Sequence, residues 1–395
     1  MKILQINSGC GYGSTGRIVT DLYDILNEKG HDCLIAYGRG TAPKGYQNYK
    51  IDTELEVKCH GLKTRLADSE GFGSKKATEK LIEKVKWYNP DVIHLHNLHG
   101  YYINIDVLFH YLANANKPVL WTLHDCWSFT GHCSHFDDIG CAKWRTGCHD
   151  CEQKEDYPAS LFLDQSRKNY FKKKELFTSV KRMMIITPSN WLSGLVEESY
   201  LQNYPIKVIH TGINLDIFKP TSSDFKKKYH LENKKIILGV ASVWSTSKGL
   251  DTFIKLAYIL PSDYQIVLVG MTEKQIQTMP KQILGLKRTN SIKVLTDIYT
   301  AADLFINPTV QEVLGLVNLE ALACGTPVIT YNTGGSSECL DESCGKIVKK
   351  GELDGLVSAI LGFKTIPIEN CIRKSKEFEK KDKFSEYIKS YGEIQ

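Results

Sequence analysis

The sequence predicts an α/β protein with two Rossmann-like domains, each built on a parallel β-sheet. Short apolar runs alternate with helical segments along the 395 residues, a pattern typical of parallel strands joined by crossover helices. The alternation restarts at Ile236–Ala241, after a linker that contains Gly212 and Pro220. A chain of this length can form two full cores. The expected parts are an N-terminal domain over 1–205 with a Cys-rich insert at 126–151, a C-terminal domain over 206–372, and a closing helix over 373–395.

The composition is that of an ordinary globular protein, with 42% hydrophobic and 24% charged residues. The formal charge of +5 is too small to indicate nucleic-acid binding, although it suits anionic substrates and weak attraction to an acidic membrane surface. No apolar run reaches the length of a membrane span, and the apolar start is too short for a signal peptide. We therefore expect a cytoplasmic protein, with peripheral attachment to the inner face of the membrane as an open alternative. In that reducing compartment the twelve cysteines should be thiols or metal ligands.

The N-terminal residues predict a βαβ opening. Lys2–Asn7 reads as a strand, a Gly-rich turn follows over Ser8–Gly16, a helix runs from Arg17 to Lys29, and Cys33–Tyr37 is the second strand. The turn contains a G-x-G-x-x-G match, which is weak evidence for a dinucleotide site because no acidic residue closes the second strand.

Three further segments of this half carry expectations. Residues 50–80 are polar and predict a mobile segment. Asp91–His96 is a strand followed by His99, where the histidines either bind substrate or satisfy structural hydrogen bonds. Asp164–Lys181 predicts a basic helix whose aromatic residues either meet a membrane-borne acceptor or lie in the core.

The insert at 126–151 has no helical or strand period and is rich in cysteine. A C-x-x-C pair with two more cysteines within 19 residues is a suitable tetrahedral zinc set, and a metal would supply the stability that the segment lacks. The alternatives are unligated thiols, an iron–sulfur cluster or a redox pair. Four thiolates leave no open position, so we expect structural zinc. The predicted ligands are Cys133, Cys141, Cys148 and Cys151.

The most informative stretch lies between Ala302 and Tyr331. A buried strand ends at Asn307, a loop carries Glu312, and Gly315 opens a helix whose free N–H groups favour phosphate. Glu320 lies about one turn inside that helix. Because carboxylates accept hydrogen bonds from sugar hydroxyls, the two acids and the anion site together indicate a nucleotide-sugar. Upstream, the short apolar run Ile292–Leu295 reads as another strand.

The run E-V-L-G-L-V-N-L-E-A-L-A-C-G-T-P-V-I resembles the E-x7-E signature of the family 4 retaining glycosyltransferases, which have the GT-B fold. The resemblance implies that Glu312 contacts hydroxyls of the transferred hexose and that Glu320 contacts the ribose. It places the diphosphate near the amides of Gly315 and Leu316, with Val317 beside them. Leu314 stands where the family usually has Phe.

Other segments extend the resemblance. Thr122-Leu123-His124-Asp125 matches T-x-H-D, which implies that His124 touches the transferred sugar, while Asp125 either orients it or meets the acceptor hydroxyl. The Gly-rich first loop makes Gly13, Gly16 and Arg17 donor-side candidates, with a purely structural turn as the alternative. Lys248 matches the family lysine that binds the diphosphate, but Val243 stands where the family often has Arg. Ser245, Thr246, Ser247 or Arg288 are the candidates to replace that Arg.

The implied function is that of a metal-independent, retaining hexosyltransferase, similar to bacterial enzymes of cell-surface polysaccharide synthesis. It would take a nucleoside diphosphate sugar as donor and a saccharide or lipid-linked saccharide as acceptor. The catalytic candidates are His124, Asp125, Lys248 and Glu312. A sugar-nucleotide epimerase, or a non-catalytic zinc-stabilised carbohydrate-binding protein, is the alternative. The resemblance also implies that the closing helix crosses back to the first domain.

Overall fold

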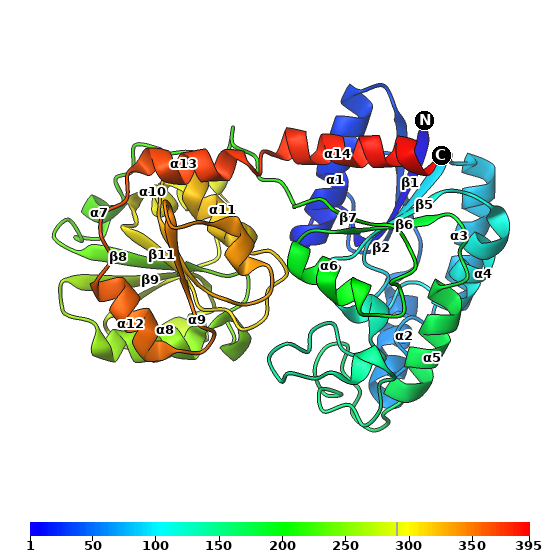
Figure 1. Cartoon of the computed structure of the whole chain (residues 1–395), viewed down its shortest axis with the longest axis horizontal. Helices are drawn as coiled ribbons and strands as arrows, with labels where there is room; N and C mark the ends of the chain where they lie inside the picture. The colour runs from blue at the N-terminus through cyan, green and yellow to red at the C-terminus, as the bar shows by residue number, and fades with distance from the viewer. Residues whose placement is uncertain (290) are drawn as a thin grey trace. The chain divides into compact units, whose positions relative to one another are not determined.

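In the computed structural model, which describes residues 1–289 and 291–395, the chain divides into two compact units (Figure 1). The first unit comprises Met1–Ile209 and Phe384–Gln395, and the second comprises His210–Lys383. Each unit has its own parallel sheet covered by helices on both faces. The predicted class, an α/β protein with two Rossmann-like sheets, is confirmed.

The first unit is built on a seven-stranded parallel sheet with the order β3-β2-β1-β4-β5-β6-β7. Because the chain moves in opposite directions from β1 and from β4, the carboxyl ends of these two neighbours flank the topological switch point, where ligands bind in such sheets. The strands are β1 Lys2–Gly9, β2 Asp32–Arg39, β3 Asn48–Lys50, β4 Val92–Leu95, β5 Val119–Thr122, β6 Met183–Thr187 and β7 Ile206–Val208.

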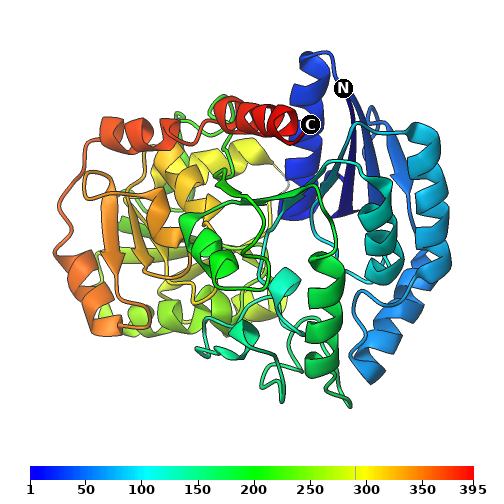
Figure 2. The same cartoon turned by 45° about the vertical axis from the view of Figure 1, so that its right-hand side comes forward.

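Helices pack on both faces of this sheet, as the turned view shows (Figure 2). Apolar residues of α1 and α14 share one core with β1 and β2. On the other face, Phe109 of α4 and Phe177 of α5 pack against Trp121 of β5. The helices are α1 Gly13–Glu28, α2 Glu54–Ala67, α3 Lys75–Tyr88, α4 Ile105–Ala115, α5 Ser166–Phe177, α6 Asn190–Glu197 and α14 Lys380–Ile394.

The prediction of a mobile segment over 50–80 is wrong, because α2 and the start of α3 lie there. A capping box begins α2: the Thr53 side chain accepts a hydrogen bond from the Glu56 amide, and the Glu56 carboxylate accepts from the Thr53 amide. The T-x-x-E pattern that encodes this cap was the available signal. It was missed because α2 buries only His60 and Thr64, so its apolar period is weak.

The insert that follows β5 contains no α-helix or strand between Cys126 and Gln165, and its only regular pieces are the 3-10 turns Trp127–Phe129 and Lys143–Arg145. It nevertheless has a small aromatic core, in which the Phe136 and Trp144 rings stack with centroids 5.1 Å apart. The insert therefore folds around aromatic side chains and thiols rather than around a hydrogen-bonded ladder.

The second unit has a six-stranded parallel sheet with the order β10-β9-β8-β11-β12-β13. Its strands are β8 Lys235–Val240, β9 Tyr264–Met271, β10 Ile283–Lys287, β11 Leu304–Asn307, β12 Val328–Tyr331 and β13 Gly345–Val348. Its helices are α7 Phe225–Lys228, α8 Leu250–Ile259, α9 Glu273–Thr278, α10 Ile292–Ala301, α11 Leu316–Ala323, α12 Leu353–Leu361 and α13 Ile368–Lys376. As in the first unit, β8 and β11 are neighbours at the switch point.

The prediction of a strand over Ile292–Leu295 is wrong, because these residues form the first turn of α10. Ser291 caps this helix by accepting a hydrogen bond from the Val294 amide, and Ile292 and Val294 are about half exposed. A four-residue apolar run does not distinguish a strand from a helix turn. The strand of this region is β10, which the prediction missed.

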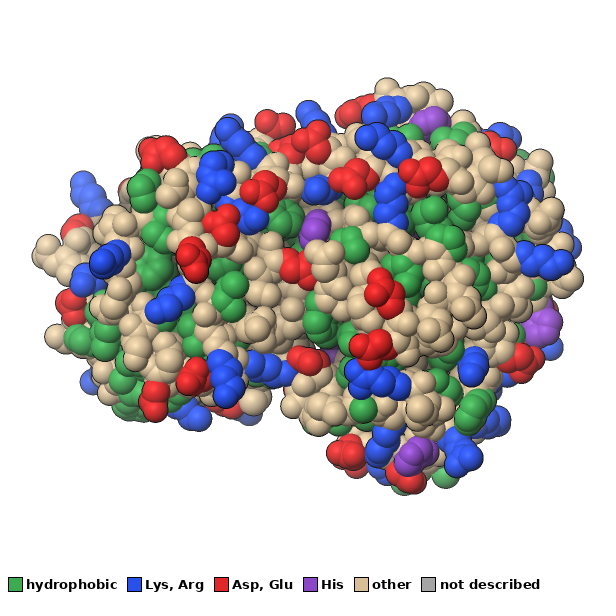
Figure 3. Space-filling view, viewed as in Figure 1, with side chains coloured by type: hydrophobic (Ala, Val, Ile, Leu, Met, Phe, Trp, Pro, Cys, Tyr) green, Lys and Arg blue, Asp and Glu red, His purple; other side chains and the backbone are tan. Residues whose placement is uncertain are grey.

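The chain returns to the first unit at its end, because the residues of α14 from Phe384 onward belong there. Within the described ranges 1–289 and 291–395, no helix is long and apolar enough to cross a membrane. On the face drawn in Figure 3, basic and acidic side chains are interspersed rather than gathered by sign.

Candidate active site

The predicted anion site of the second unit lies where β11 ends and α11 begins. Gly315 is the N-cap of α11 and has a φ of +85°, in the left-handed region that favours glycine. A Cβ on Gly315 would lie 3.0 Å from the Asn318 amide nitrogen and 3.3 Å from the Ser336 hydroxyl. Glycine therefore permits both the turn and the close packing that aim the first amides of α11 out of the helix end.

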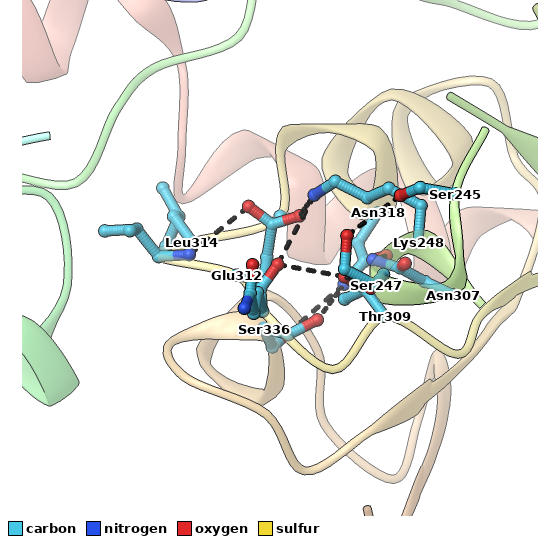
Figure 4. A network of polar contacts seen from close by, with 12 residues as sticks. Ser245, Ser247, Lys248, Asn307, Thr309, Glu312, Leu314, Asn318 and Ser336 are labelled. Atoms are coloured by element: carbon cyan, nitrogen blue, oxygen red, sulfur yellow. Dashed lines mark hydrogen bonds and ion pairs between the residues drawn. The ribbon is translucent and has the colours of Figure 1, made fainter. Parts of the chain in front are cut away.

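Glu312 and Lys248 meet beside this helix end. The Lys248 ammonium lies 3.0 Å from one Glu312 carboxylate oxygen and donates to the Gln311 carbonyl at 3.3 Å (Figure 4). The other Glu312 oxygen accepts from the Val313 amide at 3.2 Å. Both side chains keep some exposure, 39% for Lys248 and 21% for Glu312, so a ligand can reach each of them. The structure thus brings together two of the predicted catalytic residues.

A buried polar network fixes the loop that carries Glu312. Asn318 accepts from the Asn307 amide at 2.9 Å and donates to the Ser336 hydroxyl at 2.9 Å. The Ser336 hydroxyl lies 2.7 Å from that of Thr330. These contacts tie the end of β11, the first turn of α11 and the loop after β12 together (Figure 4). Such a satisfied buried network specifies one geometry for the site.

Glu320, the second acid of the predicted pair, is held from inside the unit. The Tyr299 hydroxyl donates to a Glu320 carboxylate oxygen at 2.7 Å, and the Tyr299 ring is completely buried. Burial, and next the nearby Glu320 charge, raise the pKa of Tyr299 well above its ordinary value, so the phenol stays protonated and remains a donor. Glu320 itself is half-buried.

The other predicted donor-site residues of this unit, Leu314, Leu316 and Val317, differ in how deeply their side chains are buried. Leu314 is buried in the core, so only its backbone is available to a ligand, and its carbonyl accepts from the Cys339 thiol at 2.8 Å. Leu316 and Val317 are half-buried against the same core. In both, the part that can face a phosphate is the amide in the first turn of α11.

In the first unit the Gly-rich loop joins β1 to α1. Gly16 is buried, and a Cβ there would lie 3.3 Å from the Gly11 backbone, so Gly16 has a packing role. Gly13 has a φ of +68° and would meet nothing within 4 Å, which leaves its backbone accessible. Arg17 is exposed. Gly13 and Arg17 are therefore accessible at the surface, and Gly16 supports the turn.

His124 follows β5 and is held by a chain of side chains. Gln5 donates through its amide nitrogen to the Val19 carbonyl, so its oxygen accepts from His96 Nε2 at 3.2 Å. His96 Nδ1 must then accept from His124 Nε2, at 3.1 Å. This order leaves the lone pair of His124 on Nδ1. Burial lowers the pKa of His124 to about 4, so the imidazole is neutral at pH 7.

Asp125 pairs with His99 rather than with His124. One Asp125 oxygen lies 2.6 Å from His99 Nε2, and the other accepts from the Trp127 amide at 2.9 Å. Burial opposes ionisation of Asp125, but His99 outweighs it and brings its pKa down to about 2. A carboxylate with so low a pKa is a poor proton acceptor. Asp125 thus orients His99 directly, and its two predicted roles, orienting His124 or meeting the acceptor hydroxyl, stay predictions.

Comparisons with known proteins identify the family. Residues 15–217, slightly more than half of the chain, match the model described as Glycosyltransferase Family 4. Residues 234–363 match the model described as Glycosyl transferases group 1. The chain belongs to glycosyltransferase family 4. The resemblance carried by the E-x7-E residues is thereby confirmed, and the protein is an enzyme, a glycosyltransferase.

Relatives of this glycosyltransferase support the assignment over its full length. It is 24% identical over 415 aligned positions to a putative colanic acid biosynthesis glycosyl transferase, WcaC, of Escherichia coli, with 100% of each chain covered. A processive diacylglycerol alpha-glucosyltransferase of Acholeplasma laidlawii is 28% identical over 158 residues, 37% of this chain and 47% of the relative.

Solved structures show that the glycosyltransferase has the GT-B fold. Sucrose-phosphate synthase from Thermosynechococcus elongatus aligns with a TM-score of 0.73 at 17% identity, covering 100% of this chain and 98% of the other. Anabaena HepE in complex with UDP aligns with a TM-score of 0.67 at 18% identity, covering 100% of both chains. At these identities the likeness concerns the fold.

The glycosyltransferase departs from its family at Val243. This side chain is 70% exposed, so an apolar residue faces solvent where the family often has Arg. Near Lys248, the Ser245 and Ser247 hydroxyls lie 2.9 Å apart in the loop after β8. Sequence reasoning missed Tyr299, which holds Glu320, and Gln5, which sets the histidine chain. Neither residue belongs to the motifs, and only the fold brings each of them to its partner.

The predicted zinc ligands of the glycosyltransferase lie around one small cavity in the insert, of about 20 Å³. All four thiols line it, and no disulfide joins them. In the part of the chain that the structure describes, no three His, Cys, Asp or Glu side chains already converge as a metal site. The thiols are therefore neighbours rather than a closed tetrahedron.

Proposed function

We propose that this glycosyltransferase transfers a hexose, with retention of anomeric configuration, from a nucleoside diphosphate sugar to a saccharide or lipid-linked saccharide. The acceptor would be a precursor of a cell-surface polysaccharide. The observation that carries the proposal is the pairing of Glu312 with Lys248 at the Gly315-opened end of α11. One helix end then offers a cation and amides to a diphosphate, and an acid to a sugar.

The donor site follows from the charges of these groups. A diphosphate needs hydrogen-bond donors and positive potential, which the α11 amides and Lys248 supply. A hexose offers hydroxyl donors, for which the Glu312 carboxylate is the acceptor. On donor binding, Lys248 would exchange part of its contact with Glu312 for the diphosphate, and Glu312 would turn its freed oxygen to the sugar. Glu320, fixed by Tyr299, would accept from the ribose hydroxyls.

The chemical step consists of breaking the bond between the anomeric carbon and the leaving diphosphate. Negative charge grows on the diphosphate as this bond breaks, so Lys248 and the α11 amides would stabilise the transition state more than the ground state. The acceptor hydroxyl would attack on the face that the diphosphate leaves, and the diphosphate would take its proton. In this proposal Glu312 binds sugar hydroxyls and forms no covalent glycosyl-enzyme.

The absence of an Arg at Val243 leaves Lys248 as the cation of the loop after β8. We propose that the Ser245, Thr246 and Ser247 hydroxyls complete the diphosphate site as neutral donors. We further propose that catalysis needs no metal ion, because the leaving charge is met by Lys248 and by backbone dipoles. Neutral donors stabilise a phosphate less than a guanidinium does.

The names of relatives support the proposed role in polysaccharide synthesis and the proposed type of donor. WcaC is named for colanic acid biosynthesis, a polysaccharide pathway, and it aligns over the whole chain. HepE, of the same fold, was solved with UDP and with UDP-glucose. We accordingly propose a UDP-sugar as the first donor to test and a cytoplasmic enzyme that meets its lipid-linked acceptor at the membrane surface.

The test is a donor and acceptor screen with product analysis. Purified enzyme is incubated with UDP-, GDP- or ADP-hexoses, with and without lipid-linked saccharides, in the presence of a chelator. The proposal expects acceptor-dependent nucleotide release and a glycoside whose anomeric configuration, read by NMR, equals that of the donor. Nucleotide release that is independent of any acceptor would favour an epimerase-type reaction. An inverted product would exclude retention.

A further inference from the structure

The cavity of the insert contains unpaired polar groups besides the four thiols. His132 is buried, and its Nδ1 lies 2.6 Å from a carboxylate oxygen of Asp68, but its Nε2 has no hydrogen-bond partner. Gln153, also buried, has an amide oxygen without a partner. Both residues line the cavity. Burying such atoms unpaired is unfavourable, and both lie in the wall of the cavity that the thiols line.

The thiols differ in depth but belong to one cluster. Cys133 and Cys148 are both less than 10% exposed, and Cys141 and Cys151 are half-buried. The Gly131 amide donates to the Cys148 sulfur at 3.2 Å. An N–H directed at sulfur favours a thiolate, which is the form that binds metals. Cys141 completes the ring of sulfur atoms around the cavity.

A buried cation lies next to this cluster. Lys173 of α5 is 1% exposed, and its ammonium donates to the carbonyls of Trp127 and Thr130 at 2.9 and 3.2 Å. Its positive charge also lies 3.4 Å from the centroid of the Trp127 ring. A lysine buried on neutral carbonyls alone is unfavourable. Its electrostatic neighbours are Cys148, Asp68, Glu70 and Cys133. Asp68 and Glu70 already place negative charge near Lys173, and an anionic metal site at the cysteines would add to it.

We propose that Cys133, Cys141, Cys148 and Cys151 bind one structural zinc ion in this cavity. Each thiol loses its proton to solvent as its zinc–sulfur bond forms, and the resulting site carries a charge of −2. Lys173 balances part of that charge. His132, oriented by Asp68, lies in the wall of the same cavity beside the proposed ion. The four sulfur atoms contract around the ion to close the tetrahedron.

The metal holds the insert in position over the candidate active site of the first unit. The His99 ring, which pairs with Asp125, also contacts the Tyr157 hydroxyl at 2.9 Å and the Trp127 ring. Trp127 precedes the proposed zinc ligands in sequence, and Tyr157 follows the last of them. Loss of zinc therefore loosens the residues around His99 and leaves the second unit unaffected.

The experiment measures metal in the full-length protein and in matched variants. Purified without chelator, the wild type should contain one zinc per chain by inductively coupled plasma mass spectrometry. Single Cys→Ser variants of the four ligands should lose it. The control is Cys126→Ser, which changes a buried thiol of the same insert that does not line the cavity, and it should keep its zinc. Folding of each variant is checked by binding of a nucleotide to the second unit.

Cobalt substitution tests the ligand set independently of the variants. Wild-type protein stripped of zinc and refilled with Co²⁺ should show the intense visible bands and sulfur-to-metal charge transfer of a tetrahedral four-thiolate site. His132→Gln should keep one metal per chain but release it to a chelator faster. A spectrum of mixed nitrogen and sulfur ligation with metal retained in Cys141→Ser would overturn the assignment. Metal-free wild type, or a disulfide such as Cys133–Cys151 in the non-reduced protein, would refute the site itself.

Discussion

The ammonium of Lys248 lies 3.0 Å from the carboxylate of Glu312, although 64 residues separate them in the chain. The loop after β8 supplies the lysine, and the loop after β11 supplies the acid. Since β8 and β11 are neighbours at the switch point of the sheet, their following loops meet there. This pair supplies the two groups that the proposed donor site needs. The ammonium can bind the diphosphate, and the carboxylate can accept hydrogen bonds from the sugar hydroxyls.

Glu312→Gln should lower kcat by about 100- to 1,000-fold, the range seen when one transition-state contact is removed. The amide keeps the shape but loses the charge that holds Lys248 and the sugar. Initial-rate kinetics with saturating donor measure the effect. The matched control is Glu273→Gln, which breaks the exposed ion pair of Glu273 with Lys287. Equal losses in both variants would contradict a role for Glu312 in the site.

Tyr299→Phe should raise the KM for the donor while changing kcat little. The change removes the hydroxyl that holds Glu320 at 2.7 Å, so the acid loses its fixed position for the ribose. Stability should fall by about 1.5–3 kcal/mol, because a hydrogen bond to a charged group is lost inside the unit. Kinetics and urea unfolding measure both effects. Tyr258→Phe is the control, since Tyr258 is 73% exposed. An unchanged KM would separate Glu320 from donor binding.

Gly315→Ala should reduce donor affinity and lower the free energy of unfolding by about 1–3 kcal/mol, the cost of a left-handed non-glycine residue. The added Cβ would also press on Asn318 and shift the first turn of α11. Gly351→Ala provides the comparison, because Gly351 has a φ of +77° and a Cβ there would meet nothing within 4 Å. Both variants carry the backbone strain. Only Gly315→Ala should weaken binding of the nucleotide in calorimetry.

His124 should contribute to a loss of stability in acid. Its pKa is about 4 in the folded protein and about 6.5 in the unfolded chain. Between these values the unfolded state binds more protons, so the free energy of unfolding falls as the pH decreases from about 6.5 towards 4. His94 and His96, whose pKa values burial lowers, act in the same direction. His99 and His132 have raised pKa values and act oppositely, since their stabilisation is lost as the pH rises.

His124→Asn should therefore flatten the pH dependence by about 1.4 kcal/mol per pH unit, the contribution of one proton. Urea unfolding of wild type and variant at several pH values between 4.5 and 6.5 gives the slopes. His110→Asn, a change at an exposed histidine, is measured alongside as a control for the substitution itself. If the His124 variant keeps the full slope, the imidazole is not held neutral by burial.

Particular elements show how far sequence reasoning reached. The strand, glycine and helix around Glu312 were predictable, because apolar period, helix propensity and the N-terminal anion site are local properties. The helix over 54–67 and the helix at 292–301 were not recognised. The helix over 54–67 buries only His60 and Thr64, so its apolar period is weak. In the helix at 292–301, the mostly apolar start Ile292–Leu295 was interpreted as a strand.

The sequence by itself determined the fold class and the family, and it indicated the candidate acids Glu312 and Glu320, because each depends on residues close together along the chain. Only the tertiary structure decided which partner each group has. Asp125 pairs with His99 instead of its neighbour His124, Lys248 reaches Glu312, and Tyr299 fixes Glu320. Such pairings depend on the order of the strands and on which loops meet at the sheet edge. The spacing of residues along the sequence shows neither the strand order nor which loops meet, because the free energy of long-range packing selects both.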